Sequence, residues 1–119
     1  MGKRVLLIDD DIVVRTLIAE FLSASGQIVV AGATGSVCLP MIREIQPDIV
    51  FLDYQLPDRS GLDVLKEIRS STDVCSVPVA FMSADTDTQK VAEKQNLRAN
   101  WYLTKPFDLK IIAEILKTL

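Results

Sequence analysis

The chain has 119 residues, of which 49% are hydrophobic and 24% charged, with a net charge of −3 and no histidine. This length fits one domain with a core of its own, and the acidic balance argues against a direct nucleic-acid surface, which needs clustered basic residues. There is no apolar run of membrane-spanning length and no signal-peptide pattern, so we expect a cytoplasmic protein that does not enter a membrane. Cys38 and Cys75 lie in no CxxC motif and are interpreted as free thiols.

The first half of the chain alternates between strand and helix patterns. Residues 5–8 form an apolar run that ends in three aspartates, and residues 28–31 predict a second strand. Between them a helix is expected, with Asp11 as its cap or first-turn acid and Gly26 as its stop. Its predicted buried stripe is Val14, Leu17, Ile18, Phe21 and Leu22. A second helix is expected over 34–45, where Pro40 requires either a late start near Leu39 or a kink.

The second half continues the alternation. Four apolar residues, 49–52, predict a central strand that is buried on both faces and ends at Asp53. A helix with Leu62, Leu65 and Ile68 on its buried side follows, then a strand over 77–82 and a helix over 86–95. That helix has few apolar residues, so we predict it to be the least stable. A strand over 101–103 and a final helix capped by Asp108 complete the chain.

This pattern predicts an α/β fold in which five helices cover both faces of a doubly wound, five-stranded parallel sheet. We expect one domain spanning residues 1–119 with the strand order 2-1-3-4-5. Asp9, Asp10 and Asp53 then meet at the carboxyl edge, between the first and third strands. Clustered carboxylates repel one another and therefore need a cation, and oxygen ligands favour Mg²⁺ or Mn²⁺ over zinc.

Two further groups reach the same edge. Ser83 ends the fourth strand and Lys105 follows the fifth. A metal, a lysine and a hydroxyl around a carboxylate are what phosphoryl transfer requires, with Asp53 as the nucleophile. A nucleotide or flavin site would instead have glycines and backbone donors after the first strand, where this chain has acids. Each residue alone also fits an ordinary cap, turn or surface role, so the convergence carries the prediction.

Four segments, 5–11, 47–61, 81–84 and 102–107, together resemble the receiver (CheY-like) domain of bacterial two-component response regulators, over essentially the whole chain. The resemblance implies that Asp53 accepts a phosphoryl group from a histidine kinase or phosphotransfer protein. It implies that Asp10 and Asp53 bind Mg²⁺ through their side chains and Gln55 through its backbone carbonyl, with Asp9 acting mainly through water.

The resemblance also assigns the switch. Ser83 is the hydroxyl that turns toward the phosphoryl group, Lys105 pairs with that group beside a cis peptide to Pro106, and Tyr102 is the aromatic that rotates inward. Trp101 departs from the family pattern. We interpret it as an interface residue on the face of the fourth helix and fifth strand, with ordinary packing as the alternative.

We therefore predict a signalling module that catalyses only its own phosphorylation and slow dephosphorylation, and is not otherwise an enzyme. Its output would be a partner protein or an output domain, and a phosphorylation-dependent homodimer is compatible with this. The enzyme alternative is a magnesium-dependent phosphatase of the haloacid-dehalogenase type, which needs an acid where this chain has Gln55. The third alternative is a flavodoxin-like cofactor binder, but this chain lacks the phosphate-binding loop that such a protein needs. A stand-alone regulator and an excised receiver domain both fit the sequence, which does not name the kinase.

Overall fold

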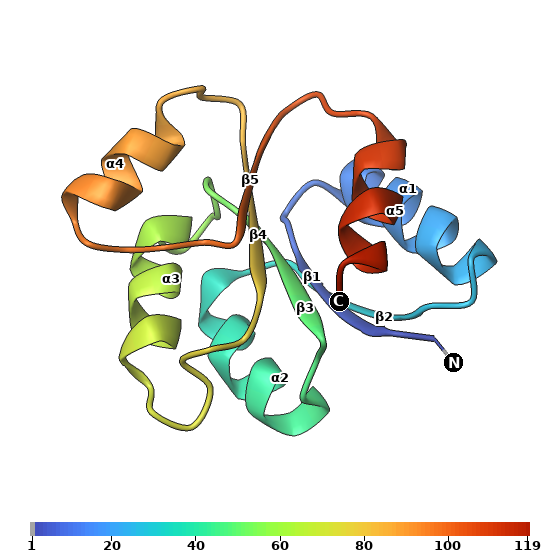
Figure 1. Cartoon of the computed structure of the whole chain (residues 1–119), viewed down its shortest axis with the longest axis horizontal. Coiled ribbons are helices and arrows are strands. Elements are labelled where there is room, and N and C mark those ends of the chain that lie inside the picture. The colour runs from blue at the N-terminus through green and yellow to red at the C-terminus, as the bar shows by residue number, and fades with distance from the viewer. Residues whose placement is uncertain (1) are drawn as a thin grey trace.

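A computed structural model describes residues 2–119, which form a parallel sheet between two layers of helices (Figure 1). The sheet runs in the order β2-β1-β3-β4-β5 with every neighbouring pair parallel. This confirms the predicted fold class and strand order. The strands are β1 (Arg4–Ile8), β2 (Ile28–Gly32), β3 (Ile49–Asp53), β4 (Val79–Ser83) and β5 (Trp101–Thr104).

The helices divide between the two faces of the sheet. Figure 1 shows α1 and α5 together on one side and α2 and α3 on the other, and α4 packs with the second group. No helix in residues 2–119 is long and apolar enough to cross a membrane. The helices are α1 (Ile12–Ala24), α2 (Cys38–Ile45), α3 (Gly61–Ser70), α4 (Thr88–Lys94) and α5 (Leu109–Lys117), and a short 3₁₀ helix, η1 (Gly35–Val37), precedes α2.

Each face of the sheet has its own hydrophobic core, because successive side chains of a strand point to opposite faces. Leu6 and Ile8 of β1 join the core under α2, α3 and α4, whereas Val5 and Leu7 join the core under α1 and α5. All four side chains are fully buried. A strand buried on both faces reads as a continuous apolar run, which is why β1 and β3 could be predicted.

The second helix starts late, which is one of the two arrangements expected from the position of Pro40. Because α2 begins at Cys38, Pro40 lies in the first helical turn, where its missing N–H interrupts no helical hydrogen bond. The fourth strand begins at Val79, two residues later than predicted, and α4 is shorter than predicted at both ends. Pro78 lies outside β4, and its carbonyl accepts a hydrogen bond from the backbone N–H of Val50.

The first helix has the predicted ends but not the whole predicted stripe. Asp11 caps it by accepting from the backbone N–H of Val13, and Gly26 adopts the left-handed conformation just after it. Leu17, however, is 53% exposed, so its assignment to the buried stripe was wrong. Only Ile18 and Leu22 of α1 are buried, because the sheet and α5 cover a narrow strip of the helix. Ile12 and Val13 also face solvent.

Candidate functional site

The ends of β1, β3 and β4 and the segment after β5 surround a cavity of about 240 Å³ at the carboxyl edge of the sheet. Adjacent parallel strands deliver their exits to the same edge, so residues far apart in sequence meet there. All six residues predicted for catalysis or metal binding line this cavity. The full lining is Asp9, Asp10, Asp11, Asp53, Tyr54, Gln55, Ser83, Ala84 and Lys105.

Three carboxylates form the floor of this cavity. Asp9, Asp10 and Asp53 each offer an oxygen within 4.8 Å of the other two. Asp9 is fully buried, Asp53 nearly so, and Asp10 is exposed. The backbone N–H of Asp11 donates to Asp9 Oδ1 at 2.9 Å, so the turn that opens α1 also orients the buried acid.

Lys105 supplies the cation of the cavity. Its Nζ donates to Asp9 Oδ2 at 2.7 Å and lies 3.3 Å from Asp53 Oδ1. Its backbone N–H donates to the carbonyl of Ser83 at 2.7 Å, which fixes the start of the loop after β5, and the Lys105–Pro106 peptide is cis. Burial alone would lower the pKa of Lys105, but the Asp9 hydrogen bond and the charges of both acids outweigh burial and raise it.

The environment of Asp53 disfavours its charged form. Burial raises the pKa of Asp53 to about 6, the charge of Asp9 adds to the rise, and Lys105 opposes it. One ammonium therefore does not balance the acids around it. A carboxyl held in this way gains most from an additional cation, which would restore its ionised form near neutral pH.

The donor set fits a hard divalent cation. Two buried carboxylates and one exposed carboxylate converge, and within residues 2–119 Lys105 is the cation that pairs with them, which leaves an excess of negative charge and oxygen ligands. Mg²⁺ is bound in proteins by one or two carboxylates and keeps several waters. The exposure of Asp10 and the open cavity leave room for such waters.

Ser83 lies at the rim between the acids and the loop before α4. Its side chain is buried, and its Oγ accepts a hydrogen bond from the backbone N–H of Asp85 at 3.0 Å. An accepting hydroxyl keeps its own proton to donate. Ser83 can therefore offer a hydrogen bond to an anion in the cavity.

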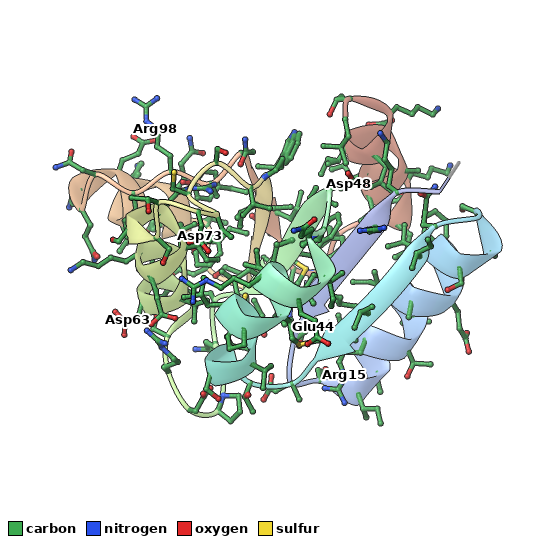
Figure 2. The ribbon with its side chains drawn as sticks, turned by 90° about the horizontal axis from the view of Figure 1, so that it is seen from below. Arg15, Glu44, Asp48, Asp63, Asp73 and Arg98 are labelled. Atoms are coloured by element: carbon green, nitrogen blue, oxygen red, sulfur yellow. The ribbon has the colours of Figure 1, made fainter. Side chains whose placement is uncertain are left out.

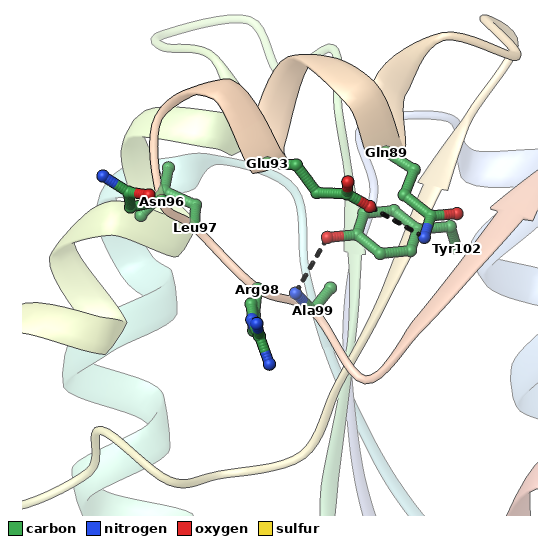
Figure 3. Close-up of a pocket in the computed structure, with 7 residues that line it drawn as sticks. All are labelled: Gln89, Glu93, Asn96, Leu97, Arg98, Ala99 and Tyr102. Atoms are coloured by element: carbon green, nitrogen blue, oxygen red, sulfur yellow. Dashed lines mark hydrogen bonds between the residues drawn. The ribbon is translucent and has the colours of Figure 1, made fainter.

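Tyr102 lies outside the acid cavity, on the α4 side of the sheet. Its ring packs edge-on against Phe81 with centroids 6.3 Å apart, and its hydroxyl accepts from the backbone N–H of Ala99 at 3.1 Å (Figure 3). The hollow beside it, of about 530 Å³, is lined by Gln89, Glu93, Asn96, Leu97, Arg98, Ala99 and Tyr102. Tyr102 thus connects β5 to the segment that follows α4.

Trp101 points to the opposite face of the sheet from Tyr102. It packs half-buried against the core under α1 and α5, and with Ile111 and Ile115 it lines a shallow groove beside α5. Its side chain therefore belongs to the β5–α5 part of the surface rather than to the α4 part.

The sequence reasoning missed one contact at the site. Arg15, labelled in Figure 2, donates from Nη1 to the backbone carbonyl of Asp9 at 2.7 Å. Arg15 follows the cap residue Asp11 by four positions, which places it one turn into α1 on the side of Asp9. The apolar stripe of α1 predicts its packing side, whereas this contact depends on a polar position of the helix.

Comparison with known proteins gives one consistent result. The family model described as the response regulator receiver domain matches residues 5–117. A protein-glutamate methylesterase/protein-glutamine glutaminase of Trichodesmium erythraeum is 36% identical over 89% of this chain and 31% of its own length. Sporulation initiation phosphotransferase F of Bacillus subtilis is 27% identical over 98% of this chain and 93% of its own length.

Solved structures agree with the sequence relatives. The receiver domain of the sensor histidine kinase PA1611 from Pseudomonas aeruginosa, which has a magnesium ion in its active-site cleft, is 28% identical with a TM-score of 0.86. That comparison covers 99% of this chain and 97% of the other. The chain spans less than half the length of the curated relatives that it matches at 33% identity or more.

Proposed function

The chain belongs to the family of response regulator receiver domains and is a phosphoacceptor module of two-component signalling, and we propose that Asp53 is its phosphoacceptor. The observation that supports this assignment is the cavity in which Asp53, Asp10, Ser83 and Lys105 meet. The haloacid-dehalogenase alternative has no support, because the match covers residues 5–117 and Gln55 replaces the acid which that reaction needs.

The proposed reaction moves a phosphoryl group from a donor histidine to Asp53. A carboxylate oxygen of Asp53 bonds to phosphorus while the P–N bond breaks, and the leaving imidazole keeps the electron pair and takes up a proton. Lys105, whose Nζ lies 3.3 Å from Asp53 Oδ1, then pairs with a phosphoryl oxygen, and Ser83 donates its hydroxyl proton to another. Water later attacks phosphorus, which releases phosphate and restores the carboxylate.

Receiver domains bind Mg²⁺, and in this chain Asp10 and Asp53 would hold the ion through their carboxylates, with Gln55 contributing its backbone carbonyl and Asp9 acting through water. When bound, the ion neutralises charge that develops on the phosphoryl oxygens. Mn²⁺ prefers the same ligands and is expected to substitute. The domain thereby catalyses its own phosphorylation and slow hydrolysis and turns over no metabolite.

The proposed donor is a histidine kinase or phosphotransfer protein of the cytoplasm, and the surface beside the cavity suits a protein donor. Ile12, Val13 and Leu17 of α1 are exposed there. A largely apolar groove of about 450 Å³ beside them shares Ala84 and Lys105 with the acid cavity. A protein that brings a histidine to Asp53 would cover these apolar side chains.

The proposed output begins when Ser83 turns to the phosphoryl group and gives up its bond with Asp85 N–H. Tyr102 would then leave Ala99 N–H and rotate inward, and the short helix α4 would shift. The β5–α5 groove with Trp101 would contact a partner, an output domain or a second copy of the chain. Trp101→Ala should weaken that association, and unchanged partner binding and dimerisation would exclude the interface role.

The test of the phosphoacceptor is incubation with acetyl phosphate and Mg²⁺ followed by intact mass measurement. One added phosphoryl group is expected on the wild type and none on Asp53→Asn or in the presence of a chelator. Asp63→Asn, an exposed acid of α3, is the matched control and should be phosphorylated normally. An adduct that persists in Asp53→Asn would place the modification elsewhere.

A further inference from the structure

The loop between β3 and α3, residues 54–60, is anchored at its tip by a carboxylate that the reaction above does not use. Asp58 Oδ1 accepts from the backbone N–H of Gly35 at 2.8 Å, and Asp58 Oδ2 from that of Ser36 at 2.9 Å. These amides open η1, whose N-cap residue Thr34 makes no side-chain capping bond. Asp58 therefore caps η1 from another loop. The hydrogen bond from the Gly35 N–H is the largest of the effects that lower the pKa of Asp58.

The same loop is closed at its base. The backbone N–H of Gly61 donates to the carbonyl of Tyr54 at 2.7 Å, and Gln55 and Ser60 form an isolated bridge. A Cβ on Gly61 would lie only 2.2 Å from the carbonyl oxygen of Asp53, so the start of α3 touches the backbone of the proposed phosphoacceptor. The loop is thus fixed at two points, one at Asp58 and one beside Asp53.

A third contact joins the loop to η1. The Arg59 side chain packs over Gly35, since a Cβ there would lie 2.6 Å from Arg59 Cγ. Arg59 Nη1 also pairs with Glu67 of α3 at 3.1 Å. The loop that carries Gln55 is therefore packed against η1, and Asp58 accepts the two hydrogen bonds that join the loop to η1.

From these contacts we propose that Asp58 is a positioning residue for the phosphorylation site. It anchors the loop so that Gln55, which lines the acid cavity together with Asp53, is already in place when a divalent cation arrives. Without this anchor the loop must be ordered at the moment of binding, which reduces affinity. Partners that orient metal ligands from outside the coordination shell are commonly worth about 10-fold or more in metal affinity. This role rests on the proposed function, because it concerns the metal site of Asp53.

Two simpler roles would give different results. If Asp58 only stabilised η1, its loss would lower the stability of the domain and leave the metal affinity unchanged. If Asp58 only contributed negative charge, any nearby exposed acid would have the same effect. Asp63, an exposed acid in the first turn of α3 (Figure 2), controls for charge, because Asp63→Ala changes the net charge equally.

The experiment compares the wild type with Asp58→Ala, Asp58→Asn and Asp63→Ala. In each, Mg²⁺ binding is followed by NMR through the backbone amides of residues 53–55, and amide exchange of Gly35 and Ser36 is measured without metal. Phosphorylation by acetyl phosphate is then measured across a range of Mg²⁺ concentrations. Asp58→Asn keeps one acceptor oxygen and should give intermediate values, and it serves as the test if Asp58→Ala does not fold.

We expect Asp58→Ala to bind Mg²⁺ about 10-fold more weakly, to exchange Gly35 and Ser36 faster, and to reach nearly the wild-type phosphorylation rate once Mg²⁺ is saturating. Asp63→Ala should match the wild type. Unchanged Mg²⁺ affinity alongside faster exchange would overturn the proposal, as would an equal weakening in Asp63→Ala. Either result leaves the phosphoacceptor assignment intact, because that depends on whether the wild type is phosphorylated at Asp53.

Discussion

Lys105 lies closer to Asp9 than to Asp53: its Nζ is 2.7 Å from Asp9 Oδ2 and 3.3 Å from Asp53 Oδ1. The fully buried acid therefore has the better ion pair, as expected if an unpaired charge costs most where water is excluded. Asp53 is left partly uncompensated, and burial together with the charge of Asp9 raises its pKa despite Lys105. The lysine thus stabilises the resting cavity mainly through Asp9, and it is already within reach of a group attached to Asp53.

Replacing Lys105 should destabilise the metal-free domain more than the metal-bound one. In Lys105→Met the buried Asp9 carboxylate loses its cation, and we expect a loss of about 2 kcal/mol in the free energy of unfolding in chelator. Mg²⁺ should reduce the loss, because a second cation then faces the acids. Urea unfolding with and without Mg²⁺ measures both values. Lys110→Met, at an exposed position of α5, should have little effect, and a metal-independent loss in Lys105→Met would contradict the account.

The pH dependence of stability should depend on Asp53. Its pKa is about 6 in the folded protein and close to 3.8 when unfolded. A raised pKa means that the folded state holds the proton longer, so stability is greatest below pH 4 for this group and falls as pH rises to about 6. Asp53→Asn removes this fall and should be more stable than the wild type at pH 7 without metal, by about 3 kcal/mol. Urea unfolding in chelator across this pH range measures the effect. The same slope of the free energy of unfolding against pH in both proteins would contradict the prediction.

Ser83→Ala should separate phosphorylation from the switch. The hydroxyl is not the nucleophile, so acetyl phosphate should still modify Asp53. A charge-assisted hydrogen bond worth about 1.5–3 kcal/mol would be lost from the phosphorylated state, which reduces the population of the switched form. NMR signals of Tyr102 and α4 should therefore shift less on phosphorylation than in the wild type. Ser83→Thr keeps the hydroxyl and should restore the shift, and a full response in Ser83→Ala would remove Ser83 from the switch.

Gly61→Ala should be among the most destabilising of small substitutions. The added Cβ would meet the carbonyl oxygen of Asp53 at 2.2 Å and Phe81 Cε1 at 2.9 Å. Backbone must move to accept it, and we expect a loss of about 2–3 kcal/mol. Gly26→Ala meets no atom within 4 Å but must keep a φ of +87°, so its loss should be nearer 1 kcal/mol. Chemical denaturation ranks the two, and the reverse order would be incompatible with the close contact at Gly61.

The strand exits could be predicted from sequence because parallel topology maps each exit to one edge. Asp9, Asp53 and Ser83 each end or follow a continuous apolar run, so their meeting required only the strand order. The Asp58 anchor could not be predicted in this way. Its two hydrogen bonds join Asp58 to residues that lie 23 and 22 positions earlier in the sequence. Loops have no register from which such a pairing follows.

The periodicity of helices and strands does not by itself decide which individual residues are buried or which face of the sheet they occupy. The period of α1 groups Leu17 with Ile18, but it does not say how wide a strip the neighbouring elements cover, and Leu17 is exposed. In β5 the alternation places Trp101 and Tyr102 on opposite faces. Which face each occupies depends on the register against β4, where Trp101 lies beside Ala80 and Tyr102 beside Phe81.

Asp9, Asp10, Asp53 and Lys105 together carry a formal charge of −2 when every acid is ionised, while the carboxylate of Asp11 is used to cap α1. A divalent cation brings this sum to zero. Phosphorylation then replaces the single negative charge of Asp53 with close to two. With the cation bound, these modified groups therefore carry about one negative charge in excess. Hydrogen-bond donors at the rim can compensate for that charge only by moving toward it. The signal that leaves this domain would then be set by a residual charge and not by the size of the added group.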